Sequence, residues 1–167
     1  MNLDQAVTTP AQNQLILDSL AEGVYGLDSK YHITFVNRAM QNMLGWSAEE
    51  LIGQDSLQLL HKVKPKGSPF PCGEYPLSWV EEGGSIFNLE ELLSCKDETV
   101  LPVEFSMNPL PESQSGTAMV VVFRDISERK ESHRNLAQAF HDMAEINNSL
   151  DKARNQLQQS EKMAAIG

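Results

Sequence analysis

The amino-acid sequence predicts an α+β domain with a five-stranded antiparallel sheet, short helices on one face of the sheet, and a long helix after the domain. Two apolar runs of strand length occur near the N-terminus and three more follow residue 84, with stretches of helical spacing between the two groups. From Ser127 on, 41 residues contain no proline and only a terminal glycine, which is typical of a helix. Strands and helices grouped in this way favour an antiparallel sheet covered on one side.

The first elements follow from short apolar patterns. Residues 1–11 are expected to be flexible, and a helix is predicted over residues 11–21. Two strands are predicted over residues 23–27 and 32–36, joined by a turn at Asp28-Ser29-Lys30. Because side chains alternate along a strand, Ile33 and Phe35 are expected to share one face of the second strand.

Helical turns are predicted in the middle of the chain. Residues 37–44 form a helix that Gly45 is placed to end, because glycine accepts the left-handed conformation. Ser47 and Glu50 have capping-box spacing, so a short helix begins there and ends near Gly53. A proline-containing loop over residues 61–75 and a short helix over residues 76–82 complete this part of the chain.

Three strands are predicted next, over residues 85–94, 100–108 and 117–125. In the second of them, alternate positions place three apolar side chains on one face: Val103, Phe105 and Met107. The unbroken run at residues 120–123 predicts a central strand that is buried on both faces.

Charge and composition exclude several classes of protein. Residues 1–126 hold 7 Lys+Arg against 17 Asp+Glu, whereas residues 127–167 hold 6 of each. This acidic domain is not expected to track nucleic-acid phosphates. We see no secretory signal and no apolar run of membrane-spanning length, so a cytoplasmic location with reduced Cys72 and Cys95 thiols is expected. A longer parent protein could still be attached to a membrane through other segments.

Four phrases in this order resemble the PAS family of sensory domains over about residues 12–130. They are residues 16–24 (ILDSLAEGV), 33–39 (ITFVNRA), 44–53 (LGWSAEELIG) and 123–130 (FRDISERK). The resemblance implies a PAS domain over residues 12–126. Two turns depart from the family, which often has a glycine where this chain has Ser29-Lys30 and Asp97-Glu98. We expect aspartate side chains to bond local amides there.

The tail, residues 157–167 (LQQSEKMAAIG), resembles the opening of the dimerisation helix of two-component sensor histidine kinases. This resemblance implies a signalling coiled-coil helix over residues 127–167, a homodimer, a downstream kinase core, ATP and Mg for the parent kinase, and a response-regulator partner. The alternative is a PAS interaction module that controls another output, such as a cyclic-dinucleotide enzyme.

No catalytic residues are predicted in this chain itself, because it has no nucleophile–base pair and no phosphate-binding loop. His141 is interpreted as an exposed helix residue, since Ala144 stands where the kinase acceptor phrase has its histidine. A metal site is not expected, because the spacing of its candidate ligands is not that of compact zinc motifs; these candidates are His61, Cys72, Glu74 and Cys95.

No cofactor is predicted in this chain, because the residues by which haem and flavin PAS domains hold theirs are missing here. A small pocket remains a hypothesis, although aromatic residues in these places are more often plain core. Its possible lining is Phe35, Trp46, Trp79, Phe87 and Phe105.

Two regions are predicted to transmit a signal. The junction consists of Asp125, Ile126, Ser127 and Glu128, where Asp125 is expected to cap the helix with Glu128 as its capping-box partner. A coiled-coil seam is predicted along the helix at Leu136, Phe140, Met143, Ile146, Leu150 and Leu157. Two successive steps of three overwind the seam locally, and an alternative register places Asn147 in it.

Overall fold

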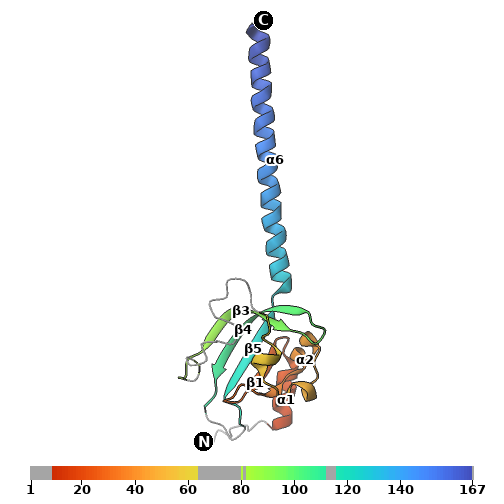
Figure 1. Ribbon diagram of the computed structural model, residues 1–167, viewed down its shortest axis with the longest axis vertical. Helices are drawn as coiled ribbons and strands as arrows, with labels where there is room; N and C mark the ends of the chain where they lie inside the picture. Colours follow the sequence, from red (N-terminus) through yellow and green to blue (C-terminus); the bar gives the residue numbers. More distant parts are fainter. Residues whose placement is uncertain (1–8, 64–79, 81, 112–115, 167) are drawn as a thin grey trace, which may run out of the picture. The chain divides into compact units, whose positions relative to one another are not determined.

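The computed structural model describes residues 9–63, 80, 82–111 and 116–166. The chain divides into two compact units, one up to Ser127 and one from Glu128 on. The described strands of the first unit form a five-stranded sheet in the order β2-β1-β5-β4-β3, in which every neighbouring pair is antiparallel (Figure 1). The predicted α+β class and the five-stranded antiparallel sheet are therefore confirmed. The strands are β1 Gly23–Leu27, β2 Ile33–Val36, β3 Ile86–Ser94, β4 Val100–Pro109 and β5 Met119–Asp125.

Within the described residues, four short helices accompany the sheet and one long helix follows it. The short helices are α1 Pro10–Ser19, α2 Arg38–Leu44, α3 Ala48–Leu51 and α4 Ser56–Leu59; the long one is α6 Ser127–Ile166. Helix α1 begins inside the segment that was predicted to be flexible, because Thr9 and Gln12 form a capping box there. Most of the predicted helix over residues 76–82 and most of the predicted loop over residues 61–75 lie outside the described residues.

Local signals in the sequence fix the ends of α2 and α3 as predicted. Asn37 caps α2, and Gly45 closes it with a φ of 75° in the left-handed region. Ser47 and Glu50 form the predicted capping box of α3. Helix α4 was not predicted, although Asp55 accepts hydrogen bonds from the amides of Leu57 and Gln58 and is a usual cap residue.

The prediction that Ile33 and Phe35 share one face of β2 is wrong. The pairing of β1 with β2 shifts between Gly26 and Leu27, so that Gly26 faces Phe35 and Leu27 faces Ile33. This bulge inserts an extra residue and turns the two side chains to opposite faces. Ile33 is consequently buried in the core, whereas Phe35 is only half-buried.

The core lies between the inner face of the sheet and helices α2 to α4. Val103, Phe105 and Met107 all point into it, as predicted for β4. Apolar side chains of the helices pack against them, among them Met40, Leu44, Leu51 and Leu60. Strand β5 is central, but its burial alternates: Val121 and Phe123 are buried, while Val120 and Val122 are half-buried. Burial on both faces of β5 was therefore an incorrect prediction.

Aspartate side chains close the two turns that lack the family's glycines, as expected. The Oδ1 atom of Asp28 accepts hydrogen bonds from the amides of Lys30 and His32 at 2.8 and 2.9 Å. Asp97 accepts one from the amide of Thr99 at 3.0 Å. Each turn also holds a residue with positive φ, Tyr31 at 65° and Glu98 at 67°, which are conformations that glycine adopts more readily. The aspartates supply local bonds that hold these turns.

Helix α6 is uninterrupted over 40 residues (Figure 1). From Glu131 to Ile166 every residue is exposed, including the predicted seam residues. Among the described residues, no helix is both long enough and apolar enough to cross a membrane.

Candidate signalling junction and inner cavity

The junction consists of the last residue of β5, the first residue of α6 and Ile126 between them. The Oδ1 atom of Asp125 accepts a hydrogen bond from the amide of Ser127 at 2.8 Å. Ile126, between them, is only 2% exposed, and its amide donates to the carbonyl of Pro102 at 3.0 Å. A hydrogen bond from the Ser127 amide to a side chain and a backbone hydrogen bond from Ile126 therefore tie the start of α6 to the sheet.

The hydrogen bond accepted by Asp125 differs from that of a capping box. Its partner is the amide two residues on, which is an aspartate turn, whereas a capping box would use the amide three residues on. Glu128 is exposed at the start of α6, where its negative charge interacts favourably with the positive end of the helix dipole. The junction therefore still satisfies one of the amides that a helix leaves open at its start.

A cross-strand ion pair lies beside the junction. Arg124 of β5 pairs in register with Glu104 of β4, and its guanidinium bonds the Glu104 carboxylate. The Glu104 side chain is mostly buried, whereas that of Arg124 is mostly exposed. This pair joins β4 to the end of β5, two residues before Ile126.

A small cavity lies in the core between α4 and the sheet. Its volume is about 10 Å³, and Tyr25, Ser56, His61 and Phe105 are among the residues that line it. The Ser56 hydroxyl is buried and has no hydrogen-bond partner among the described residues. A space of this size fits about one water molecule, and the Ser56 hydroxyl would be one of its partners.

Two ionisable side chains are buried in this core. Tyr25 is 2% exposed, and burial together with the negative charge of Glu91 raises the pKa of its hydroxyl well above the ordinary value. Glu91 is 1% exposed and lies opposite Val103 on the inner face of β3. The sequence analysis did not find Glu91, because an acidic pair in the middle of a strand resembles a solvated edge.

The four described residues of the proposed pocket lining do not come together in one cavity. Phe105 lines the small cavity, whereas Trp46 packs half-buried against the edge of the core. Phe35 lies on the other face of the sheet, beside Gly26. Phe87 is 67% exposed, because β3 has a bulge between Ile86 and Leu89. Trp79 lies outside the described residues.

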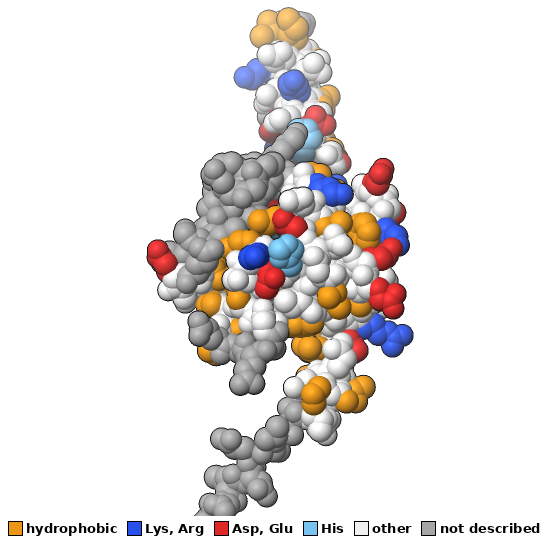
Figure 2. Space-filling view, turned by 60° about the horizontal axis from the view of Figure 1, so that its bottom comes forward, with side chains coloured by type: hydrophobic (Ala, Val, Ile, Leu, Met, Phe, Trp, Pro, Cys, Tyr) orange, Lys and Arg blue, Asp and Glu red, His pale blue; other side chains and the backbone are white. Residues whose placement is uncertain are grey.

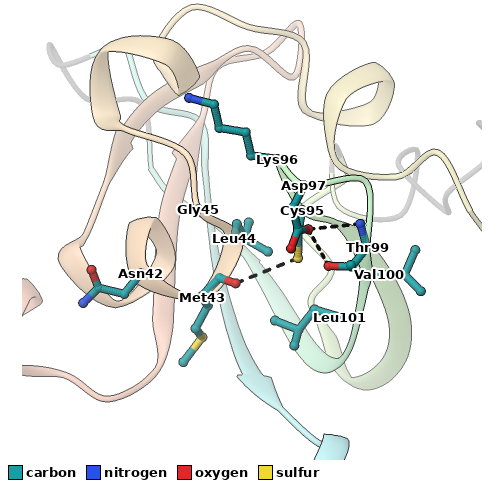
Figure 3. Close-up of a pocket in the computed structure, with 10 residues that line it drawn as sticks. All are labelled: Asn42, Met43, Leu44, Gly45, Cys95, Lys96, Asp97, Thr99, Val100 and Leu101. Atoms are coloured by element: carbon teal, nitrogen blue, oxygen red, sulfur yellow. Dashed lines mark hydrogen bonds between the residues drawn. The ribbon is translucent and has the colours of Figure 1, made fainter.

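A surface groove of about 450 Å³ lies between the end of α2 and the turn from β3 to β4 (Figure 3). Its wall includes Met43, Cys95, Asp97 and Thr99, and the Cys95 thiol is half-buried 3.9 Å from the carbonyl oxygen of Met43. Beside it, the ammonium of Lys96 bonds the carboxylate of Glu50 at 2.5 Å. This bond lowers the pKa of Glu50 to about 2, because it favours the charged carboxylate.

The other candidate residues carry no assembled site. Within the described ranges, no group of three His, Cys, Asp or Glu side chains is placed to hold a metal ion; Cys72 and Glu74 lie outside these ranges. His141 is exposed on α6, with its Nε2 atom 3.5 Å from a carboxylate oxygen of Glu145. On the face shown in Figure 2, acidic and basic side chains are interspersed.

Asn37 is a second buried polar residue whose importance the sequence analysis missed. It is fully buried, and its side chain makes four hydrogen bonds that join the end of α1, the start of β1 and the first turn of α2. The signal was present, since asparagine before a helical segment is a preferred cap. The contacts with α1 and β1 could not be derived from local pattern.

The family model of the PAS fold matches residues 11–126. This chain therefore belongs to the PAS family. The PAS domain of nitrogen regulation protein NR(II) from Vibrio parahaemolyticus superimposes with a TM-score of 0.55 at 20% identity, covering 71% of this chain and 100% of that chain. A PAS domain from Colwellia psychrerythraea superimposes with a TM-score of 0.57 at 22% identity, covering 71% of this chain and 97% of that chain. Likeness at this level of identity concerns the fold.

Two relatives from Escherichia coli (strain K12) have names that indicate different enzymatic activities. The signal transduction histidine-protein kinase AtoS is 30% identical over 142 residues, covering 83% of this chain and 22% of AtoS. The probable diguanylate cyclase DgcE is 29% identical over 130 residues, covering 77% of this chain and 12% of DgcE. The chain thus spans less than a quarter of the length of either relative.

Proposed function

We propose that this chain is the sensory input and dimerisation segment of a two-component signal-transduction histidine kinase. In this proposal the PAS domain passes a signal through Asp125, Ile126 and Ser127 into α6. A second copy of the chain pairs with α6 and the two helices lead into a kinase core. That core would use ATP and Mg to autophosphorylate and would then serve a response regulator.

The continuity of β5 with α6 is the observation that carries the proposal. Only Ile126 separates the central strand from a helix of 40 residues, so a change in the sheet acts on the helix over one residue. The likeness to AtoS supports a kinase output. It covers 83% of 167 residues, about 139, which exceeds the 126 residues before α6 and therefore includes part of α6.

A cyclic-dinucleotide enzyme is the second candidate for the output. The likeness to the probable diguanylate cyclase DgcE supports it at nearly the same identity. This likeness covers 77% of 167 residues, about 129, so at least three of the matched residues lie in α6. The residues of the parent protein after Gly167 decide between the two outputs.

We expect the chain to sediment as a dimer at tens of micromolar and a version ending at Lys130 to sediment as a monomer. The truncated version lacks all the apolar positions of α6 that are spaced for pairing. Sedimentation equilibrium measures both masses against the 18.6 kDa of one chain. If both versions are monomers, or if the truncated one dimerises as tightly as the whole chain, pairing through α6 is wrong.

Replacing Asp125 by alanine is expected to change kinase output in the full-length protein while leaving the PAS domain folded. The variant loses a cap contact, which typically contributes about 0.5 to 2 kcal/mol. That is small beside the stability of a domain but comparable to the free-energy gap between two signalling states. The measurements are the melting temperature of the chain and autophosphorylation of the parent protein, with and without its stimulus.

Two variants control for this substitution. Asp125→Asn keeps an oxygen that accepts from Ser127, so its output should stay near that of the wild type. Ser127→Ala keeps the backbone amide that donates this bond, and it should behave in the same way. A near-native melt of Asp125→Ala with unchanged output would exclude Asp125 from signalling.

A further inference from the structure

Three rows of side chains run along α6 at intervals of seven residues. Residues seven apart lie in line when helices supercoil with 3.5 residues per turn. The shared row is Leu136, Met143, Leu150 and Leu157; the small row is Ser132, Ala139, Ile146, Ala153 and Ser160; the polar row is His133, Phe140, Asn147, Arg154 and Glu161. All three rows are exposed, with Phe140 at 64% and Ile146 at 59%.

The shared row has the small row on one side and the polar row on the other. A seam made of the shared and small rows is an unbroken heptad pattern from Ser132 to Ser160. A seam made of the shared and polar rows would place Phe140 between the helices instead of Ala139. The two seams differ by a rotation of each helix of about 50°, one seventh of a turn.

We infer that α6 pairs with the α6 of a second copy through a seam with two alternative packings near its start, Ala139 inside or Phe140 inside. The inference rests on the homodimer of the proposed function and names the surface that changes. In the Ala139 packing the whole helix uses the small row. In the Phe140 packing the seam passes from Phe140 through Met143 to Ile146, two successive steps of three, which overwind the coil locally.

The two halves of α6 differ in their freedom to change rows. In the C-terminal half, the polar row would bring Arg154 against the partner's Arg154 and Glu161 against the partner's Glu161, so the small row is favoured there. In the N-terminal half, the polar row offers Phe140, whose burial removes a large exposed apolar side chain from water. The choice between the Ala139 packing and the Phe140 packing is therefore confined to the N-terminal half of α6.

Charge fits a second, parallel copy of the chain as the partner. Residues 127–167 hold equal numbers of cations and anions, so pairing meets no net repulsion. When two small-row seams pair in parallel, the positions that flank the seam carry no like charges against each other. Asp142 meets the partner's Asn147, Ser149 meets the partner's Arg154, and Gln156 meets the partner's Glu161.

Disulfide cross-linking of single-cysteine chains tests the two packings, with Cys72 and Cys95 first replaced by serine. Ser132→Cys reports the small row, His133→Cys reports the polar row, and Glu131→Cys points away from both and is the background. Ala153→Cys reports pairing in the C-terminal half in either packing, with Lys152→Cys as its outward-facing control. Circular dichroism verifies that each variant keeps its helix.

Two substitutions should bias the packings in opposite directions. Phe140→Ala removes the large apolar side chain that is buried in the Phe140 packing. It should raise the ratio of Ser132→Cys to His133→Cys cross-links on the order of tenfold. Ala139→Glu places a charge inside the seam of the Ala139 packing but on an exposed flank of the Phe140 packing. The ratio of Ser132→Cys to His133→Cys cross-links should therefore fall severalfold. Glutamate is a good helix former, so the helix itself is preserved.

The outcomes separate the inference from the homodimer. If Ala153→Cys cross-links above Lys152→Cys but neither substitution moves the ratio, α6 has one fixed seam and the two packings are wrong. If Ala153→Cys cross-links no better than Lys152→Cys, α6 is not paired, and the homodimer fails together with the inference. Opposite shifts of the ratio by the two substitutions would establish both packings.

Discussion

Asn37→Ala is expected to lower the free energy of unfolding by about 3 to 5 kcal/mol. The side-chain oxygen accepts from the amides of Val24 and Met40 at 2.9 and 3.1 Å, and the side-chain nitrogen donates to the carbonyls of Leu17 and Glu22 at 2.9 Å each. Alanine removes all four bonds, of which the two to the amides of Val24 and Met40 are buried and the two to the carbonyls of Leu17 and Glu22 are part-buried. Each unsatisfied buried polar group costs about 1 to 3 kcal/mol. Urea unfolding measures the loss.

Asn42→Ala is the matched control, because Asn42 lies on the same helix but is exposed. Its free energy of unfolding should change by less than about 0.5 kcal/mol. The two variants remove the same chemical group, so the difference between them isolates the buried bonds. A loss below about 1 kcal/mol for Asn37→Ala would contradict the bonding described here.

Gly23→Ala is expected to destabilise the PAS domain by about 1 to 3 kcal/mol or more, which is the usual cost of overpacking. A Cβ atom at this position would lie 2.2 Å from the ring of Phe123. That ring is 1% exposed and packs edge-on against Tyr25, with 6.1 Å between ring centroids, so it has no room to withdraw. Thermal or urea unfolding measures the change.

A second-site variant tests the cause of this effect. In a Phe123→Leu background the smaller side chain leaves space for the new methyl group, so adding Gly23→Ala should cost much less there. Gly26→Ala is a comparison on the other face of the sheet, where the added Cβ would lie 2.3 Å from the Phe35 ring. Phe35 is only half-buried and can turn away, so Gly26→Ala should cost less. Equal costs at both glycines would contradict this account.

The sequence predicted those elements whose signal is local. Strand β1 and the caps of α2 and α3 depend on residues a few positions apart, and the structure confirms them. The aspartate-closed turns at Asp28 and Asp97 are local as well. Helix α4, with only four residues, is too short to show periodicity.

The errors arose where strands meet. The face of Phe35 depends on a bulge that forms only when β1 and β2 pair, and alternation within β2 alone gives the opposite result. Burial of Glu91 depends on its place opposite Val103 in β4, which its own neighbours do not reveal. The proposed aromatic pocket combined residues by type, whereas the sheet separates Phe35 and Phe105 onto opposite faces.

The bulge in β3 also bears on how two copies of the domain avoid aggregation. Strands β2 and β3 are the outermost strands of the sheet, and an outermost strand offers free backbone groups to any other strand. Strand β2 is only four residues long, and β3 is interrupted by its bulge and by Asn88, whose φ is 51°. Glu90 adds a charge on the exposed side of β3. Irregularity and charge of this kind resist sheet extension by a second copy, so the proposed dimer would carry less risk of strand-to-strand fusion between its two PAS domains.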